Sequence, residues 1–192
     1  ADPGGDEGEG EVEVEVEDGI QRFAVLSFDG VMHGPRRDSE DSPEDLFFNV
    51  LNPVAARDNS VQGGADIFQI AAVAESFDVA AADSPIGTDI RFDTSKIMYV
   101  GHSQGGNAGA LAVPYEPLIH STVLSGTGGG LLLSLLDKRS PVDLSAGIQL
   151  VMAETDPAFQ LDQFHPVLSM VQWFVDAADP GSYARYWFKE PK

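Results

Sequence analysis

One short stretch of the chain has residue types that could carry out nucleophilic catalysis. Residues 101 to 105 read Gly-His-Ser-Gln-Gly, a Gly-x-Ser-x-Gly pattern centred on Ser103. At a sharp turn from a strand into a helix, such a serine presents its hydroxyl at the tip, and the flanking glycines let the two backbones approach closely. The helix directs its N-terminal N–H groups at the same tip, where negative charge develops during acyl transfer. The pattern therefore predicts a nucleophilic serine.

The residues on either side of this pattern predict the elements that would position the serine. Residues 96 to 100 form a short apolar run that ends at glycine, as expected of a buried parallel strand. Residues 104 to 113 are rich in Ala and Gly and predict a helix that Pro114 ends. Residues 118 to 124 form a second strand-like run. This order of strand, turn, helix and strand favours a nucleophile elbow, and the alternative is a Gly-rich structural turn.

The segments before the elbow predict an α/β architecture. Residues 22 to 28 are the first convincing strand, and residues 35 to 58 are polar and contain prolines, which is typical of a loop. A helix is expected from Asn59, with Asn59 or Ser60 as its cap, because apolar residues then recur at helical spacing. Residues 83 to 93 make a turn-rich crossing back to the elbow strand. The economical arrangement is a mostly parallel sheet with flanking helices.

The segments after the elbow contain further apolar runs. Residues 131 to 136 predict a leucine-rich helix, and residues 165 to 174 predict another helix with an apolar face. Residues 148 to 152 fit a strand or a helix equally well. A leucine stripe is more often core than an acyl-binding wall or a lid, so we expect residues 131 to 136 to be core.

Length and charge limit the class of protein. The 192 residues suit one domain that buries its own core, and the absence of cysteine excludes disulfides and thiolate sites. Nine of the 31 acidic residues lie in positions 1 to 18, which we expect to be an acidic tail or linker, although the Glu-Val alternation over 11 to 17 also fits an edge strand. The domain would then span residues 19 to 192. Of the 31 acidic residues, 22 lie in residues 19 to 192 beside 11 basic ones, so the body stays acidic, which argues against nucleic acid and anionic lipid as partners.

Several features are not expected in this sequence. No apolar run approaches the ~18 residues that a membrane span needs, and residues 1 to 20 show no signal-peptide pattern. The acidic stretch 38 to 45 lacks the spacing and the central glycine of a calcium loop, so we interpret it as a solvated charged run. We therefore expect no metal and no cofactor.

Three stretches of the chain resemble the α/β-hydrolases, specifically the secreted bacterial lipases and esterases with Gly-His-Ser-Gln-Gly-Gly at the elbow. The resemblance covers most of residues 22 to 190, and two later segments are also similar to that group. The stretches are Phe28-Asp29-Gly30 with His33-Gly34-Pro35-Arg36; Asn52-Pro53 with Arg57, Asn59 and Gln62; Gly101 to Gly106; and, later, Leu161 to Pro166 and Ala178-Asp179-Pro180.

The resemblance implies roles for residues at the elbow. Ser103 would be the nucleophile, and the backbone N–H of Gln104 would donate to the oxyanion. A second donor would come from a loop after an earlier strand. His33-Gly34 is one candidate for that loop; alternatively, residues 22 to 28 are the strand that follows the oxyanion loop, and the second donor then precedes residue 1.

A serine nucleophile also needs a base and an orienting carboxylate, which in this family follow the serine in the order acid, then histidine. His165 could pair with Asp156 as an in-chain triad, but the two are only nine positions apart, too few for the strand, helix and strand that usually lie between them. His120, within an apolar run, is interpreted as a buried structural histidine. The resemblance instead implies that the acid and histidine strands lie outside this chain, which would be a central fragment, a processed piece or one part of a split enzyme.

Two functions remain open at this point. The first is a serine hydrolase of carboxylic esters, acting on a small-molecule or lipid ester through an acyl-enzyme at Ser103, with a second polypeptide segment completing the sheet. The resemblance implies a secreted, periplasmic or cell-surface location for such an enzyme. The second is a non-catalytic module that keeps a hydrolase-like scaffold for binding or assembly.

Overall fold

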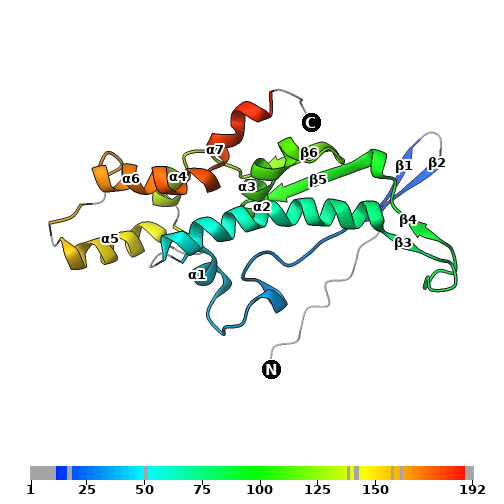
Figure 1. The fold of residues 1–192 in the computed structure, drawn as a ribbon, viewed down its shortest axis with the longest axis horizontal. Coiled ribbons are helices and arrows are strands. Elements are labelled where there is room, and N and C mark those ends of the chain that lie inside the picture. Colours follow the sequence, from blue (N-terminus) through cyan, green and yellow to red (C-terminus); the bar gives the residue numbers. More distant parts are fainter. Residues whose placement is uncertain are drawn as a thin grey trace. The chain divides into compact units, whose positions relative to one another are not determined.

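The computed structural model describes residues 12–16, 19–49, 52–137, 139–140, 143–156, 158–160 and 162–188 (Figure 1). The chain divides into two compact units. The first joins residues 1–28 to residues 77–92, and the second joins residues 29–76 to residues 93–192. The elbow and its neighbours all belong to the second unit.

The first unit consists of two antiparallel strand pairs. Strand β1 (Val12–Val16) pairs with β2 (Gly19–Phe23), so that Val12 lies opposite Phe23. Residues 12–16 of the alternating segment therefore form a strand, which was one of the two alternatives for this segment; residues 1–11 and 17–18 of the expected tail lie outside the described residues. Strand β3 (Asp78–Val79) pairs with β4 (Ile90–Arg91) in a short hairpin.

The predicted strand over residues 22 to 28 is wrong beyond its first two residues. Strand β2 ends at Phe23, and residues 24–28 follow with no strand assignment. Val25 is 77% exposed and Phe28 is 44% exposed. An apolar run forms a buried strand only where neighbouring strands pair with it, and no described residue pairs with residues 24–28.

The second unit contains the predicted elbow topology. Strand β5 (Ile97–His102) and strand β6 (Ile119–Ser125) are parallel neighbours, and helix α3 (Gln104–Ala112) connects them (Figure 1). The helix ends before Pro114, which lies in the short turn Val113–Tyr115, as expected of a residue that cannot continue a helix. The order of strand, turn, helix and strand is therefore confirmed.

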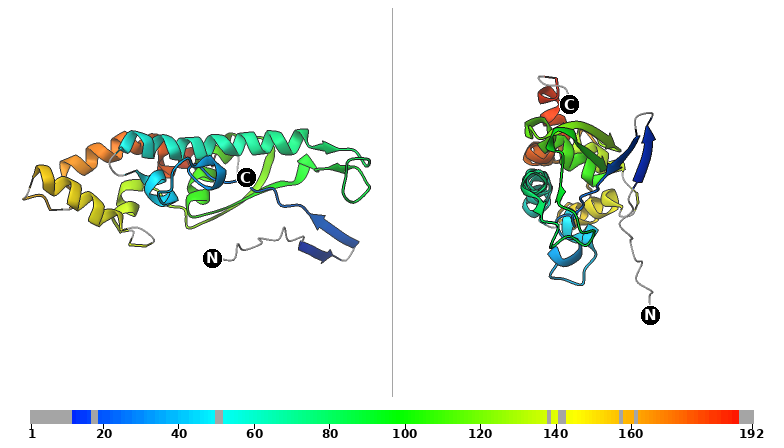
Figure 2. Two further views of the ribbon diagram at one scale, coloured as in Figure 1. Left: turned by 90° about the horizontal axis from the view of Figure 1, so that it is seen from below. Right: turned by 90° about the vertical axis from the view of Figure 1, so that its right-hand side faces the viewer.

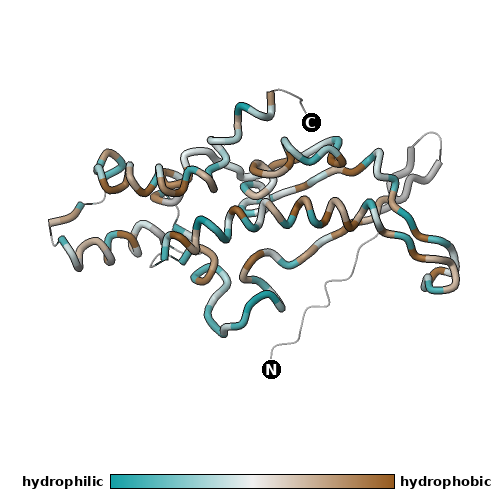
Figure 3. The backbone as a smooth tube through the Cα atoms, viewed as in Figure 1, coloured by the Kyte–Doolittle hydropathy of each residue, from teal (hydrophilic) through white to brown (hydrophobic). Residues whose placement is uncertain are grey.

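A long helix packs beside α3. Helix α2 (Pro53–Ser76) lies alongside α3 (Figure 2), and the absence of side chains at Gly63 and Gly64 lets its backbone approach Ala108 and Leu111. Polar and apolar residues alternate in short groups along α2 (Figure 3). Side chains from α2, α3 and both strands form the core beneath the elbow. Its buried members are Ile67, Ala112, Val113 and Ile119, with Ile97, Tyr99, Ala108 and Trp187 packed against them.

Two predictions about the segment before α3 are wrong. The expected loop over 35 to 58 contains helix α1 (Pro43–Phe48), whose N-terminus is capped by Ser42 accepting from the Asp45 N–H. Helix α2 begins at Pro53 rather than Asn59, because the Asn52 side chain accepts from the Ala55 N–H and caps it there.

The remaining helices form a second cluster. Helices α4 (Leu131–Asp137) and α6 (Pro166–Val175) were both predicted, and the undecided segment 148 to 152 belongs to helix α5 (Leu144–Thr155). Leu132 and Leu136 of α4 are buried against Leu168 of α6, so these leucines are core, as expected. The shortest helices are α7 (Pro180–Tyr183) and the single turns η1 (Gly34–Arg36), η2 (Thr94–Lys96), η3 (Val113–Tyr115), η4 (Asp176–Ala178) and η5 (Ala184–Tyr186).

The chain thus combines helices with small sheets, in agreement with the α/β class. Among the described residues three strand pairs are present, and β5 with β6 is the parallel one. The sheet is therefore much smaller than the mostly parallel sheet expected from the sequence.

Candidate active site

Ser103 occupies a strained backbone conformation between β5 and α3. Its φ is 51° and its ψ is −113°, a combination that non-glycine residues rarely adopt. Such strain costs about 1–3 kcal/mol and persists only where surrounding contacts enforce it. The Ser103 N–H donates to the carbonyl of Ser125 at 2.8 Å, and the Ser103 carbonyl accepts from Asn107 N at 3.0 Å. These two bonds tie the turn to β6 on one side and to α3 on the other.

The Ser103 hydroxyl is left available by this conformation. Ser103 is exposed, and although it is the N-cap of α3, its side chain forms no capping hydrogen bond. None of the described residues forms a hydrogen bond with its Oγ atom. Gln104 begins α3, and within the same described part of the chain no residue accepts from its backbone N–H. An exposed hydroxyl therefore lies next to an unoccupied N–H at a helix N-terminus.

Close contacts at the elbow leave no room for a side chain at Gly101, in the motif, or at Gly106, just after it. A Cβ atom on Gly101 would lie 2.6 Å from the Gly105 carbonyl oxygen, and one on Gly106 would overlap the Thr127 hydroxyl. By contrast, the nearest atom to a Cβ on Gly105 would be the Tyr99 hydroxyl at 3.8 Å. The structure therefore distinguishes between the two glycines of the motif: Gly101 is required by close backbone contact and Gly105 is not.

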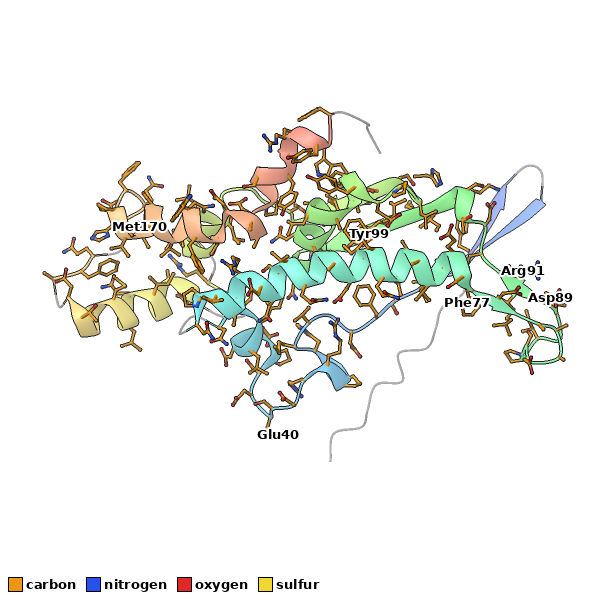
Figure 4. All side chains as sticks on the ribbon, in the orientation of Figure 1. Glu40, Phe77, Asp89, Arg91, Tyr99 and Met170 are labelled. Carbon is orange, nitrogen blue, oxygen red and sulfur yellow. The ribbon has the colours of Figure 1, made fainter. Side chains whose placement is uncertain are left out.

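Tyr99 supports the turn from within β5. Its hydroxyl donates to the Gly105 carbonyl at 2.6 Å, so the strand holds the first turn of α3 directly. Its ring lies against the faces of Gly101 and Gly109, where a side chain would meet the ring at 2.7 Å or closer. Burial raises the pKa of this hydroxyl above its ordinary value, so it stays a neutral donor. Tyr99, labelled on β5 in Figure 4, is packed against the buried core cluster.

The end of β6 supports the elbow from the other side. The ring Nδ1 of His102 lies 3.1 Å from the hydroxyl of Ser125, whose carbonyl accepts from Ser103 N. Gly126 follows with a φ of 66°, and a Cβ there would make ordinary contacts of 3.7 Å with the His102 ring and 3.8 Å with the Ser103 nitrogen. The segment Ser125–Gly130 is therefore part of the site, and we refer to it as the glycine loop.

The loop that contains His33 and Gly34 also approaches the elbow. A Cβ on Gly30 would lie 3.7 Å from His33 Nδ1 and 3.9 Å from the Gln104 side-chain amide. Arg36 holds this loop on α2, because it donates to the Asp29 carbonyl at 3.0 Å and forms an ion pair with Asp66 at 2.5 Å. The His33 ring is bonded to the Val31 carbonyl at 2.8 Å. The loop thus borders the side chain that follows the serine.

Asp156 and His165, the in-chain triad candidates, have local partners. Asp156 is exposed and its carboxylate accepts from the Ala158 N–H at 3.0 Å. His165 caps α6, with its Nδ1 accepting from the Val167 N–H at 3.2 Å. Among the described residues neither side chain is hydrogen-bonded to the other or to Ser103.

His120 has a structural contact but is not buried. Its Nε2 lies 3.1 Å from the Thr94 carbonyl, and the residue is exposed. The prediction of a buried histidine is therefore wrong, because alternation along β6 places His120 on its exposed side while Ile119 enters the core.

One carboxylate beside the site was noted in the sequence only as part of the resemblance and was given no role there. Asp179 is only 2% exposed and lies in contact with the glycine loop. The Asp-Pro pair at 179–180 is a helix N-cap signature, and that signal identifies a cap but not the second segment that the same carboxylate binds.

Comparisons of the chain with known protein families, with curated proteins and with solved structures find no match. Within the described residues, no three His, Asp or Glu side chains are grouped so that they could hold a metal ion. No helix of the same residues combines the length and the apolar character needed to cross a membrane.

Proposed function

We propose that this chain carries the nucleophile of a serine hydrolase that acts on carboxylic esters through an acyl-enzyme at Ser103. One observation carries the proposal: a non-glycine residue is held at φ 51° and ψ −113° at the junction of a parallel strand and a helix, with its hydroxyl exposed. Strained backbone of this kind is concentrated at functional sites. A serine that only connected two elements would adopt a relaxed conformation.

The neighbouring groups are consistent with acyl transfer. Attack by Ser103 Oγ on an ester carbonyl places negative charge on the carbonyl oxygen, and the backbone N–H of Gln104 at the start of α3 is an available donor for that charge. The Tyr99 and Ser125 contacts hold this N–H and the hydroxyl in fixed relation. Collapse of the resulting tetrahedral intermediate breaks the ester bond, releases the alcohol and leaves the acyl group on Ser103 Oγ. Water then attacks the acyl carbonyl, which frees the carboxylic acid and restores the hydroxyl. In this proposal the acid and the base come from outside the described residues, from a further segment or a second polypeptide.

A fluorophosphonate probe tests this function. The protein isolated in its native, complete form should be modified at Ser103, as mapped by peptide mass spectrometry, and Ser103→Ala should abolish the modification. Ser95→Ala is the matched control, because Ser95 is another exposed serine of the same unit and its N–H and hydroxyl both donate to Asp93. Labelling of Ser103→Ala at the wild-type rate would contradict the assignment.

A second function is favoured by a different observation. None of the described residues forms a hydrogen bond with the Ser103 hydroxyl, the Asp156 carboxylate is bonded to the Ala158 N–H, and His165 caps α6. This supports a non-catalytic module that keeps the scaffold for binding or assembly. A folded native protein that takes no probe and hydrolyses no activated ester would support the module, whereas turnover restored by adding a second polypeptide would support the split enzyme.

A further inference from the structure

The glycine loop is fastened at its far end by a buried carboxylate from a distant part of the chain. The Oδ1 atom of Asp179 accepts from the Gly130 N–H at 3.1 Å, and its Oδ2 atom accepts from the Leu131 N–H at 2.5 Å. The same carboxylate caps α7 by accepting from the Gly181 N–H at 2.7 Å. One side chain therefore caps two helices, α4 and α7, and joins them.

Gln172 of α6 completes this arrangement. Its amide nitrogen donates to Asp179 Oδ2 at 2.6 Å, and its amide oxygen accepts from the Leu132 N–H at 2.9 Å. The Asp179 oxygens thus receive four N–H donors, which leaves them no capacity to orient a catalytic histidine. Asp179 consequently does not fit the acid of a triad, although it is a buried carboxylate that follows the serine in the chain.

The backbones on either side of the carboxylate are in close contact. A Cβ on Gly129 would lie 3.1 Å from the Gly181 Cα atom, and one on Gly181 would lie 3.0 Å from Asp179 Oδ1. Only residues without side chains allow the glycine loop and the start of α7 to approach this closely. The two glycines and the carboxylate form one compact junction.

The other end of the glycine loop contacts the elbow. The Ser125 carbonyl accepts from Ser103 N, and the Thr127 hydroxyl fills the space over Gly106. The Gly128 N–H donates to the Asn107 side chain at 3.4 Å. Contacts that hold residues 129 to 131 in place therefore also hold Ser125 and Thr127 against the elbow.

We propose that Asp179 is a positioning residue for the Ser103 elbow, acting through the glycine loop that its buried carboxylate holds against α7. The proposal rests on the proposed function for its catalytic meaning, but the coupling itself is a property of the structure. It predicts that loss of the carboxylate loosens residues 126 to 131 and, through them, the Ser103 N–H.

Amide hydrogen exchange of the chain, resolved by residue with NMR, tests the coupling without any activity. Asp179→Asn keeps the shape of the side chain but directs an NH₂ group at N–H donors, so the Gly130, Leu131 and Ser103 amides should exchange at least about tenfold faster. Asp176→Asn is the control, because it removes a nearby carboxylate that accepts from Gln172 and does not touch the loop. Its exchange rates should stay within about twofold of wild type.

A second variant and a second readout keep the test decisive. Gln172→Met removes only the side-chain amide, so it should speed exchange of Leu132 and, more weakly, of the loop, even if Asp179→Asn folds poorly. Exchange that rises uniformly over the chain, or not at all at Ser103, would overturn the coupling. In the native protein, fluorophosphonate labelling should slow about tenfold in Asp179→Asn and should not change in Asp176→Asn. A wild-type protein that takes no label refutes the hydrolase and leaves the exchange result to decide the coupling.

Discussion

Alanine in place of one glycine of the Gly-x-Ser-x-Gly motif should destabilise the protein, whereas alanine in place of the other should not. In Gly101→Ala the new methyl group would lie 2.6 Å from the Gly105 carbonyl oxygen and 2.7 Å from the Gly105 carbonyl carbon. Both atoms are backbone, so the start of α3 must move away from β5. In Gly105→Ala the nearest atom would be the Tyr99 hydroxyl at 3.8 Å, an ordinary contact.

The size of each effect follows from these distances. Overpacking costs about 1–3 kcal/mol, and Gly101→Ala belongs at the upper end of that range because no flexible side chain can give way. Alanine within a helix is favoured over glycine by roughly 0.5–1 kcal/mol, so Gly105→Ala should stabilise the protein. The two variants should therefore differ in free energy of unfolding by about 3–4 kcal/mol.

Urea and thermal unfolding, followed by circular dichroism, measure this difference. A free-energy change of 1 kcal/mol moves the midpoint of a domain of this size by about 2–4 °C, so Gly101→Ala should melt roughly 6–12 °C lower than wild type. Gly105→Ala should melt at the wild-type temperature or a few degrees above it. If the two variants lose equal stability, or if Gly101→Ala costs nothing, then strand and helix do not meet at Gly101 as described.

Two further predictions concern caps in the second unit. Asn59→Ala removes the buried amide that donates to the last carbonyls of α1 at 3.2 and 3.0 Å, and it should lower the free energy of unfolding by about 1–3 kcal/mol in urea titrations, whereas Ser60→Ala, whose hydroxyl bonds within its own helix, should change it by less than about 0.5 kcal/mol. At the start of α5 the Ala146 N–H donates to the Asp143 carboxylate, and this hydrogen bond lowers the pKa of the Asp143 carboxyl below its ordinary value. Because the folded-state pKa of Asp143 is the lower one, the stability that it contributes is complete above the unfolded-state pKa and is lost as pH falls through the folded-state pKa. An NMR titration of Asp143 should show the lowered pKa. Between the folded-state and unfolded-state pKa, the free energy of unfolding should depend less on pH in Asp143→Asn than in wild type.

The elbow could be predicted from the sequence because its determinants are local. An apolar run, a glycine, a serine, an Ala-rich stretch and a proline follow in order, and each acts on its immediate neighbours. The sharp turn at Ser103 was predicted from the same pattern, whereas its strained φ and ψ are known only from the structure. Which glycine is sterically required was not, since that depends on how Tyr99 and Gly105 meet in space.

The predictions failed where the start of a helix depends on which residue caps it, or where a strand depends on a neighbouring strand to pair with. Helix α2 begins at Pro53 because Asn52 caps it, yet Asn59 has an equally good capping side chain that the fold uses to bond α1 instead. The apolar segment 24–28 has strand propensity but no partner strand among the described residues. Propensity in isolation cannot supply the missing ladder.

The double cap at Asp179 could not be found from the sequence at all. Its bonds to the α4 N-terminus join residues separated by 48 and 49 positions, and no local pattern marks that pairing. The sequence shows glycines at 129 and 181, but it does not show that their backbones meet, and that close contact is the reason that neither position has room for a side chain.

The support of α3 by late residues has a consequence for the order of folding during synthesis. The indole N–H of Trp187 donates to the carbonyl of Ala110, across 77 positions, and the ring packs into the core beneath the elbow. A ribosome therefore completes the Ser103 turn well before it makes the residues that enclose this core. Local contacts of β5 and α3 can form early, but closure of the core must wait for the late segment, as is usual for contacts of long sequence separation. During that interval the part of the core that Trp187 covers in the folded protein has no cover from this side chain.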